Sequence, residues 1–411
     1  MLHKLEWVCL PSFLWIVRLQ AQLLRAACQP SVSPTDITSD WVVAQCTEVG
    51  AQEQWAHKLC ERKDVVKDLK LTVLKHLETI AGLEDEVKQE IWESFCNNVS
   101  FNRGFDPSGR PPFAMSSIMD AKVLLMMRGF FESFYEPTFG KKYGYKIPDG
   151  DTFKDFNRSH FLDDFAAAKG NPSKICPLCD GDLGRPQVDH WIPKAKYPFL
   201  SCHPLNLVPI CASCNKHKLD KLPLNLDLTS APFDNWFHPY LRTANRGIRI
   251  KFSSTSPIYG LTIESLDPND QIKLNNLDTL SGLQELWTKE LASCVRRTIK
   301  KIEDSNVQLT LGICDTDSEE DLSAKLKIKI REWSDERHAE IGDRCFAILE
   351  HQYLQSVERH EAETFDELFI ALKNSLYGGQ VDAVTGEKAK DGNRPDPLAD
   401  LREIASYPLI L

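Results

Sequence analysis

The sequence predicts an α+β protein that is predominantly helical, and three observations support this. Apolar residues recur at helical spacing over 53–97 and 117–136, and a second mostly helical stretch covers 280–375. One strand pair, at 248–252 and 260–265, precedes that second stretch. Between the helical regions, a short cysteine-rich segment has the pattern of two strands and a helix. We therefore expect a small metal-stapled module inserted between a helical N-terminal region and an α+β C-terminal region.

The helical pattern of 53–97 rests on an apolar stripe made of Val66, Leu69, Val73, Leu77 and Ile80. Asn, Gly and Pro residues crowd 98–116 and should interrupt it. A capping box formed by Ser117 and Asp120 predicts the start of the next helix, and Pro137 helps to end it. The Met and Phe residues of that helix are expected to form a core face rather than a cofactor site.

Five regions follow from these patterns. They are a helical N-terminal region (1–115), a helical connector (116–171), the cysteine-rich module (172–225), a mostly helical C-terminal region with the strand pair (226–377) and a flexible tail (378–411).

The first thirty residues allow more than one interpretation. Residues 5–29 are largely apolar and follow a basic MLHK, as in a secretory signal, but Arg18 and Arg25 interrupt them and no cleavage site follows. An amphipathic helix, or an extension upstream of the true start, is favoured. Because no run of about 18 uncharged apolar residues exists, we expect no membrane-spanning helix and a cytoplasmic protein.

The chain carries a net charge of −10 over 411 residues, from 49 Lys and Arg against 59 Asp and Glu. Such a chain can bind nucleic acid only through a local basic patch. Residues 172–223 supply one, with seven basic and four acidic side chains. We expect nucleic-acid contacts, sensitive to salt, from four lysines of this segment: Lys194, Lys196, Lys216 and Lys218.

Two Cys-x-x-Cys pairs flank the module, Cys176/Cys179 and Cys211/Cys214. Four thiolates in a tetrahedron suit a structural Zn²⁺, and a site with four protein ligands has no open position for catalysis. A redox role would need only one pair. The other cysteines are scattered and the total of thirteen is odd, which predicts reduced thiols rather than a disulfide scaffold. Since the module has only about 50 residues, metal binding should supply part of its folding energy.

Between the cysteine pairs, Val188, His190 and Ile192 alternate as in a strand, which places Asp189 on the opposite side from His190. Residues 206–210 (NLVPI) predict a second short strand, and Asn215 lies where a helix should follow the second cysteine pair.

The order Cys-x-x-Cys, Asp-His-x-x-Pro-Lys, Asn-Leu-Val-Pro, Cys-x-x-Cys-Asn-x-x-Lys resembles HNH endonucleases of the ββα-metal (His-Me finger) superfamily, in their zinc-stapled form. The resemblance covers about 45 of the 411 residues. It implies a metal-dependent nuclease that cuts phosphodiester bonds, with DNA favoured over RNA. A weaker resemblance to HNH proteins of bacterial antiphage defence loci suggests an antiviral effector, with a protein partner such as an ATPase.

The resemblance also implies roles for single residues. His190 matches the general base, and Asp189 and Asn215 match the ligands of a catalytic Mg²⁺ or Mn²⁺. Asn206 matches the middle asparagine, which holds the loop and orients the histidine. Many relatives carry histidine as the last ligand; here His217 lies two residues beyond Asn215, and residues so spaced do not share a helix face.

Two alternatives stay open at this point. A four-cysteine ribbon could be a non-catalytic interaction module, although such a module has no use for Asp189, His190, Asn206 and Asn215 together. An RNase or tRNA-cleaving nuclease could use the same site. His203, in the loop between the strands, is expected to serve that loop or a phosphate, and a role as a spare metal ligand stays open.

Overall fold

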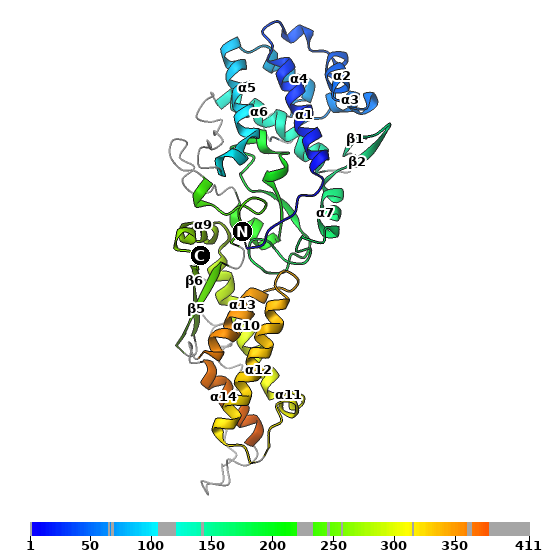
Figure 1. Cartoon of the computed structure of the whole chain (residues 1–411). Coiled ribbons are helices and arrows are strands. Elements are labelled where there is room, and N and C mark those ends of the chain that lie inside the picture. The colour runs from blue at the N-terminus through cyan, green and yellow to red at the C-terminus, as the bar shows by residue number, and fades with distance from the viewer. Residues whose placement is uncertain are drawn as a thin grey trace, which may run out of the picture.

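The computed structural model shows an elongated molecule with helices at both ends and the cysteine-rich segment between them (Figure 1). It describes residues 2–64, 66, 70–105, 121–140, 144–219, 233–244, 247–255, 258–314, 316–359 and 364–377. Over these ranges the protein is predominantly helical, with three two-stranded antiparallel sheets. The α+β, mostly helical fold class is therefore confirmed.

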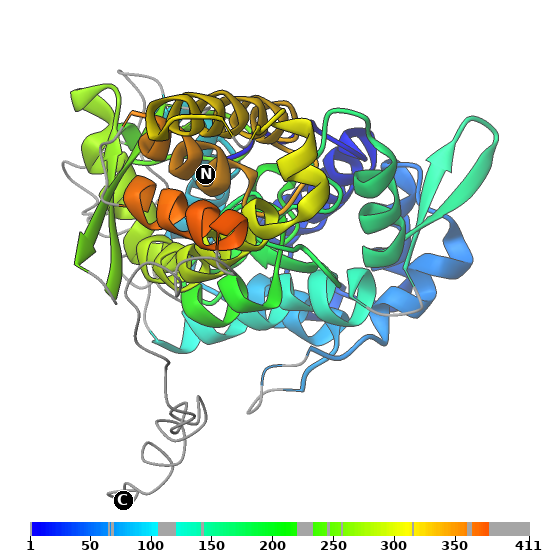
Figure 2. The same cartoon turned by 90° about the horizontal axis from the view of Figure 1, so that it is seen from below.

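Six helices form the N-terminal end: α1 (Leu10–Ala27), α2 (Ser39–Glu48), α3 (Glu53–Cys60), α4 (Val73–Ala81), α5 (Asp85–Val99) and α6 (Ala121–Phe134). The first of them is amphipathic, as expected for residues 5–29, because Phe13, Ile16, Leu19 and Leu23 lie buried along one face. A hairpin of β1 (Tyr145–Asp149) and β2 (Thr152–Phe156) projects from this end (Figure 2), and α7 (Arg158–Ala167) follows it.

The prediction of one helical stretch over 53–97 is wrong, because the stretch contains three helices: α3 ends at Cys60, α4 spans Val73–Ala81 and α5 begins at Asp85. The carboxylate of Asp64 accepts backbone N–H bonds from Val66 at 2.9 Å, Lys70 at 3.1 Å and Leu71 at 3.0 Å. Its second oxygen also bonds the buried His76 ring at 2.7 Å. A buried carboxylate that collects loop amides in this way stabilises the loop against continuation of the helix.

The helix expected at 117–136 is α6, which ends at Phe134 and is followed by a π-helical turn, Tyr135–Phe139. Pro137 therefore lies within that turn. Ser117 and Asp120 lie outside the described residues. The Met and Phe side chains of α6 are buried in the core, as predicted.

The C-terminal end joins a hairpin, β5 (Ile248–Thr255) with β6 (Ile258–Ser265), to helices α9 (Gln271–Ser281), α10 (Leu283–Glu303), α11 (Ser305–Thr310), α12 (Glu319–Ala339), α13 (Ala347–Glu358) and α14 (Thr364–Tyr377). Both the strand pair and the helical stretch were predicted. The expected tail, 378–411, lies outside the described residues.

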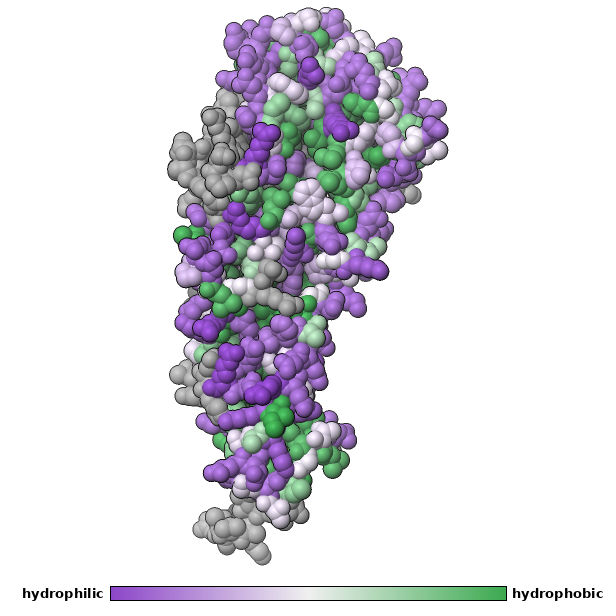
Figure 3. Space-filling view, viewed as in Figure 1, coloured by the Kyte–Doolittle hydropathy of each residue, from purple (hydrophilic) through white to green (hydrophobic). Residues whose placement is uncertain are grey.

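None of the helices in the described ranges is long and apolar enough to cross a membrane. Most of the face seen in Figure 3 is hydrophilic, and apolar side chains gather on it over the N-terminal helices.

Two apolar cores meet at the cysteine-rich segment, which contains β3 (Gln187–His190), β4 (Leu207–Ile210) and α8 (Ala212–Lys218). Val188 and Leu207 belong to the N-terminal core, and Trp191 and Ile210 to the C-terminal core. The segment is therefore fixed from both sides, and its polar residues are held by a scaffold that extends far beyond it.

Candidate functional site

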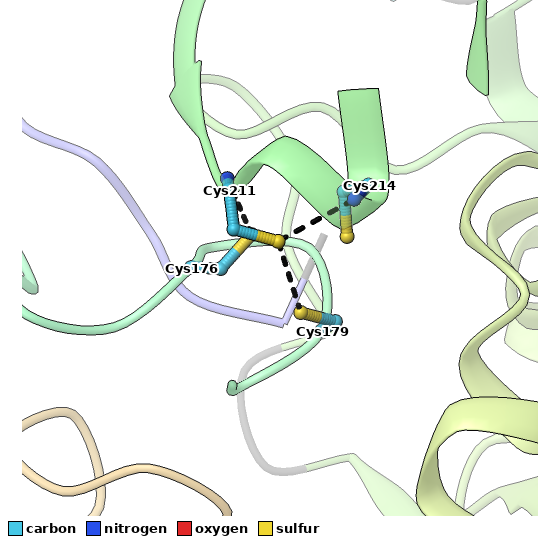
Figure 4. A group of neighbouring side chains, drawn as sticks. All are labelled: Cys176, Cys179, Cys211 and Cys214. Carbon is cyan, nitrogen blue, oxygen red and sulfur yellow. Dashed lines mark hydrogen bonds between the residues drawn. The ribbon is translucent and has the colours of Figure 1, made fainter. Parts of the chain in front are cut away.

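The four predicted cysteines come together in one buried cluster (Figure 4). Their sulfur atoms all lie within 4.8 Å of one another. The Sγ atoms of Cys179 and Cys211 are 3.9 Å apart, close to the ~3.8 Å edge of a tetrahedron with Zn–S bonds of about 2.3 Å. All thirteen cysteines are described and none forms a disulfide. The cluster can hold a metal ion such as zinc.

Local turns bring these thiols together. In the first pair, the Cys176 N–H donates to Gly181 O at 2.8 Å, which closes a tight turn around Asp180, whose φ is +61°. In the second pair, Cys211 caps α8 and its Sγ accepts the Cys214 N–H at 3.4 Å. The Cys211 N–H in turn donates to the Cys176 sulfur at 3.4 Å, which links the two pairs. Such N–H bonds favour the thiolate form that a metal requires.

The first cysteine turn also contacts the N-terminal segment and two of the C-terminal helices. The buried Asp180 carboxylate bonds His3 Nε2 at 2.7 Å and accepts the Ile348 N–H at 3.0 Å. The indole N–H of Trp287 donates to Cys179 O at 2.8 Å. The cluster is therefore a joint between the N-terminal segment, the two strands and the C-terminal helices.

Replacing Cys176 with serine should remove the metal and destabilise the whole protein. Its sulfur is fully buried, and three thiolates leave the tetrahedron incomplete. Elemental analysis of the purified protein should fall from about one tightly held zinc to well below one, with a lower unfolding midpoint in denaturant. Cys202→Ser is the matched control, since Cys202 is equally buried but lies outside the cluster. Unchanged zinc in Cys176→Ser would contradict the assignment.

Strands β3 and β4 pair antiparallel, with Asp189 opposite Val208 and His190 opposite Leu207, and α8 packs on β3. The expected order of strand, loop, strand and helix is thus present. The loop between the strands, residues 191–206, is held by Asn206, which is fully buried. Its side chain accepts the Ile192 N–H at 2.7 Å and donates to Ile192 O and Leu200 O, both at 3.0 Å. These bonds join the start of the loop to its later part.

Replacing Asn206 with alanine should destabilise this loop. Three buried backbone groups would lose their partner, at about 1–3 kcal/mol each, so we expect more than about 3 kcal/mol of lost stability. Denaturant unfolding measures this directly. The matched control is Asn171→Ala, another buried asparagine with backbone partners, which follows α7 and hydrogen-bonds the backbone of Glu6 in the N-terminal segment. It should lower stability without altering the loop; a smaller cost for Asn206→Ala than for Asn171→Ala would contradict the assigned role.

The loop in turn holds His190. The imidazole Nε2–H donates to Ser201 O at 2.9 Å, because a carbonyl can only accept, and this leaves the lone pair on Nδ1. The residue is 7% exposed. Burial, together with the nearby ammonium groups of Lys194 and Lys218, lowers the pKa of His190 to about 3. The imidazole is therefore neutral at pH 7.

Asp189 lies on the other side of β3 and meets a lysine. The Lys218 ammonium lies 2.8 Å from Asp189 Oδ2 and donates to His190 O at 2.5 Å. Burial raises the pKa of the Asp189 carboxyl, and the Lys218 charge opposes that shift. Lys218 was expected to contact nucleic acid, but it is only 1% exposed and lies beneath the strand instead. The reason is its helical position, which faces β3 rather than solvent. Lys196 and Lys216 are exposed and Lys194 is half-buried.

Asn215 and Lys218 are three residues apart in α8 and share the helix face toward β3. The Asn215 amide nitrogen donates to Gln187 Oε1 at 2.5 Å, while Lys218 reaches Asp189 two residues further along the strand. His217 lies on another face, against Gly282, where an added Cβ would come within 2.8 Å of its ring. Asn215 therefore faces β3 and His217 does not; the ligand role of Asn215 stays a prediction.

His203 serves the loop, which is one of the roles expected for it, whereas the sequence did not indicate that Tyr135 contacts the site. His203 is buried, with Nε2 bonded to Val99 O at 3.1 Å and Nδ1 accepting the Leu205 N–H at 3.3 Å. It therefore ties the loop to α5, rather than facing a phosphate. Tyr135, from the π-helical turn after α6, has its ring centroid 4.4 Å from that of His190. No motif connects residues so far apart in the chain, although π-helical turns are frequent at functional sites.

Comparison with known proteins gives a local match. The chain is 43% identical over 56 residues to "Protein ea31" of Escherichia phage lambda, a stretch that is 13% of this chain and 18% of that protein. No family model matches the sequence, and no solved structure matches it. The similarity thus spans a small part of either chain.

Proposed function

We propose that this protein is a metal-dependent HNH endonuclease that hydrolyses phosphodiester bonds in nucleic acid, with DNA as the expected substrate. One observation carries the proposal. Asp189 and His190 lie on one strand, the helix face bearing Asn215 packs against that strand, and Asn206 fixes the loop that orients the imidazole. A zinc-bound interaction module would have no use for a neutral imidazole beside a carboxylate and an amide that could bind a metal ion.

The residues divide the chemistry between them. Asp189 and Asn215 supply a carboxylate and an amide oxygen, a donor set that suits a hard cation such as Mg²⁺ or Mn²⁺. Such an ion, when bound, stabilises charge on the phosphate and the leaving oxygen. The neutral His190 can take a proton from the attacking water at Nδ1. The lysines at the rim, Lys194, Lys196 and Lys216, would hold the nucleic-acid backbone, which explains how an acidic chain could bind it.

A cleavage assay tests the proposal. The purified full chain is incubated with supercoiled plasmid, single-stranded DNA, and single- and double-stranded RNA, with Mg²⁺, with Mn²⁺ or with chelator. We expect plasmid nicking that requires the divalent ion and disappears in His190→Ala. Cleavage confined to RNA would favour the ribonuclease alternative. No cleavage of any substrate, with zinc in place, would favour the interaction module.

A further inference from the structure

The π-helical turn after α6 brings two side chains from outside the cysteine-rich module to the proposed active site. Tyr135 is buried, and its hydroxyl donates to Val188 O at 3.2 Å. Its ring meets the His190 ring edge to face, at an interplanar angle of 63°. Tyr135 thus contacts the strand on both sides of Asp189, and it places the next residue, Glu136, at the edge of the site.

Lys194 reaches across to this turn. Its ammonium lies 4.6 Å above the centroid of the Tyr135 ring and 2.5 Å from Glu136 Oε1. The Lys194 side chain is 22% exposed and that of Glu136 is 37% exposed. The lysine is therefore at the rim, next to the imidazole, with its charge already matched by a carboxylate.

We propose that Glu136 is a competitor of nucleic acid: its carboxylate pairs with the Lys194 ammonium until a phosphate of the nucleic acid takes the place of the carboxylate. This inference rests on the proposed function and adds a mode of regulation to the same site. Partly exposed ion pairs are weak, so a phosphate that arrives with other backbone contacts can displace the carboxylate. The Tyr135 face keeps Lys194 in place during the exchange. Without a bound polyanion, the site presents a neutralised lysine and a carboxylate that repels weakly bound phosphate.

The exchange has a measurable consequence for affinity. Glu136→Gln keeps the shape of the side chain but removes its charge, so Lys194 is available from the start. We expect the Kd for nucleic acid to fall about twofold to fivefold, in line with a weak ion pair. Lys194→Met should raise the Kd, and Glu136→Gln should then add little in the Lys194→Met background, because the two residues act through one contact.

The experiment uses the full chain with His190→Ala, so that binding is measured without cleavage. Fluorescence anisotropy with a labelled 20-base-pair DNA duplex gives Kd for each variant at one fixed salt concentration. Asp155→Asn is the matched control, since it removes an acid from a different exposed ion pair, that with Lys146 at 2.6 Å. It should leave Kd unchanged. Thermal unfolding of each variant verifies the fold.

Three outcomes would overturn the inference. Glu136→Gln could leave Kd unchanged or raise it; it could tighten binding equally in the Lys194→Met background, which would indicate general repulsion; or Asp155→Asn could tighten binding as much. If the unmutated protein cleaves DNA while one of these results holds, only the competitor role fails. If the unmutated protein neither binds nor cuts nucleic acid, the proposed function fails, and the competitor role with it.

Discussion

Replacing His190 with alanine is expected to reduce phosphodiester cleavage by about 10²- to 10⁴-fold, the usual contribution of a positioned general base. The expectation rests on the neutral imidazole, which hydrogen-bonds Ser201 O and packs against the Tyr135 ring. Nothing in the thiol cluster depends on this side chain, so the zinc content should stay the same. Initial rates of plasmid nicking, measured beside elemental analysis, provide the comparison.

The control for this variant is another histidine of the same module. His217→Ala removes an imidazole from α8 that packs against Gly282, away from β3. It should keep at least half of the original nicking rate. Equal losses in both variants would mean that the effect comes from the fold, and an undiminished rate in His190→Ala would mean that another group is the base.

Replacing Asp189 should abolish the proposed divalent-ion-dependent cleavage and leave the zinc content unchanged, because Asp189 lies outside the cysteine cluster that would hold zinc. The choice of substitution matters. Asp189→Ala would also leave the Lys218 ammonium buried without its carboxylate, and breaking a buried ion pair costs about 3–5 kcal/mol. Asp189→Asn keeps the shape and a hydrogen-bond acceptor, so its loss of activity should come with a smaller loss of stability.

Three quantities are measured for Asp189→Asn and for Asp189→Ala: the nicking rate, the zinc content per chain and the free energy of unfolding. Adding Lys218→Met to Asp189→Ala should recover part of the lost stability without restoring activity, since the unpaired charge is then gone. Zinc loss in Asp189→Asn would show that the residue serves the thiol cluster. Full activity there would remove it from the proposed site.

The secondary structure and the cysteine cluster were largely predictable because they depend on short sequence patterns. The spacing of Cys176, Cys179, Cys211 and Cys214 predicts the buried cluster, and the alternation around His190 predicts β3. The helical periods and the strand pair near 250 and 262 are similarly encoded by neighbouring residues. The placement of Asn215 and His217 on different faces of α8 required only the helix period.

The remainder depends on contacts between distant residues. Periodicity alone could not show that Asp64 would collect loop amides and divide the stretch at 53–97. Nor could it show that Lys218 would be buried against Asp189, because a lysine in a basic segment is usually solvated. The approach of Tyr135 and Glu136 to the site arises from the packing of α6, which no motif records.

In the proposed site, Asp189 and Asn215 would hold one divalent ion at the strand that carries His190. Titration of the zinc-loaded protein with Mn²⁺, followed by electron paramagnetic resonance, tests it most directly. We expect one Mn²⁺ site in the unmutated chain, weakened at least tenfold by Asp189→Asn or by Asn215→Ala, with the double variant little worse than either one. Mn²⁺ binding that is unchanged in both single variants would contradict the account.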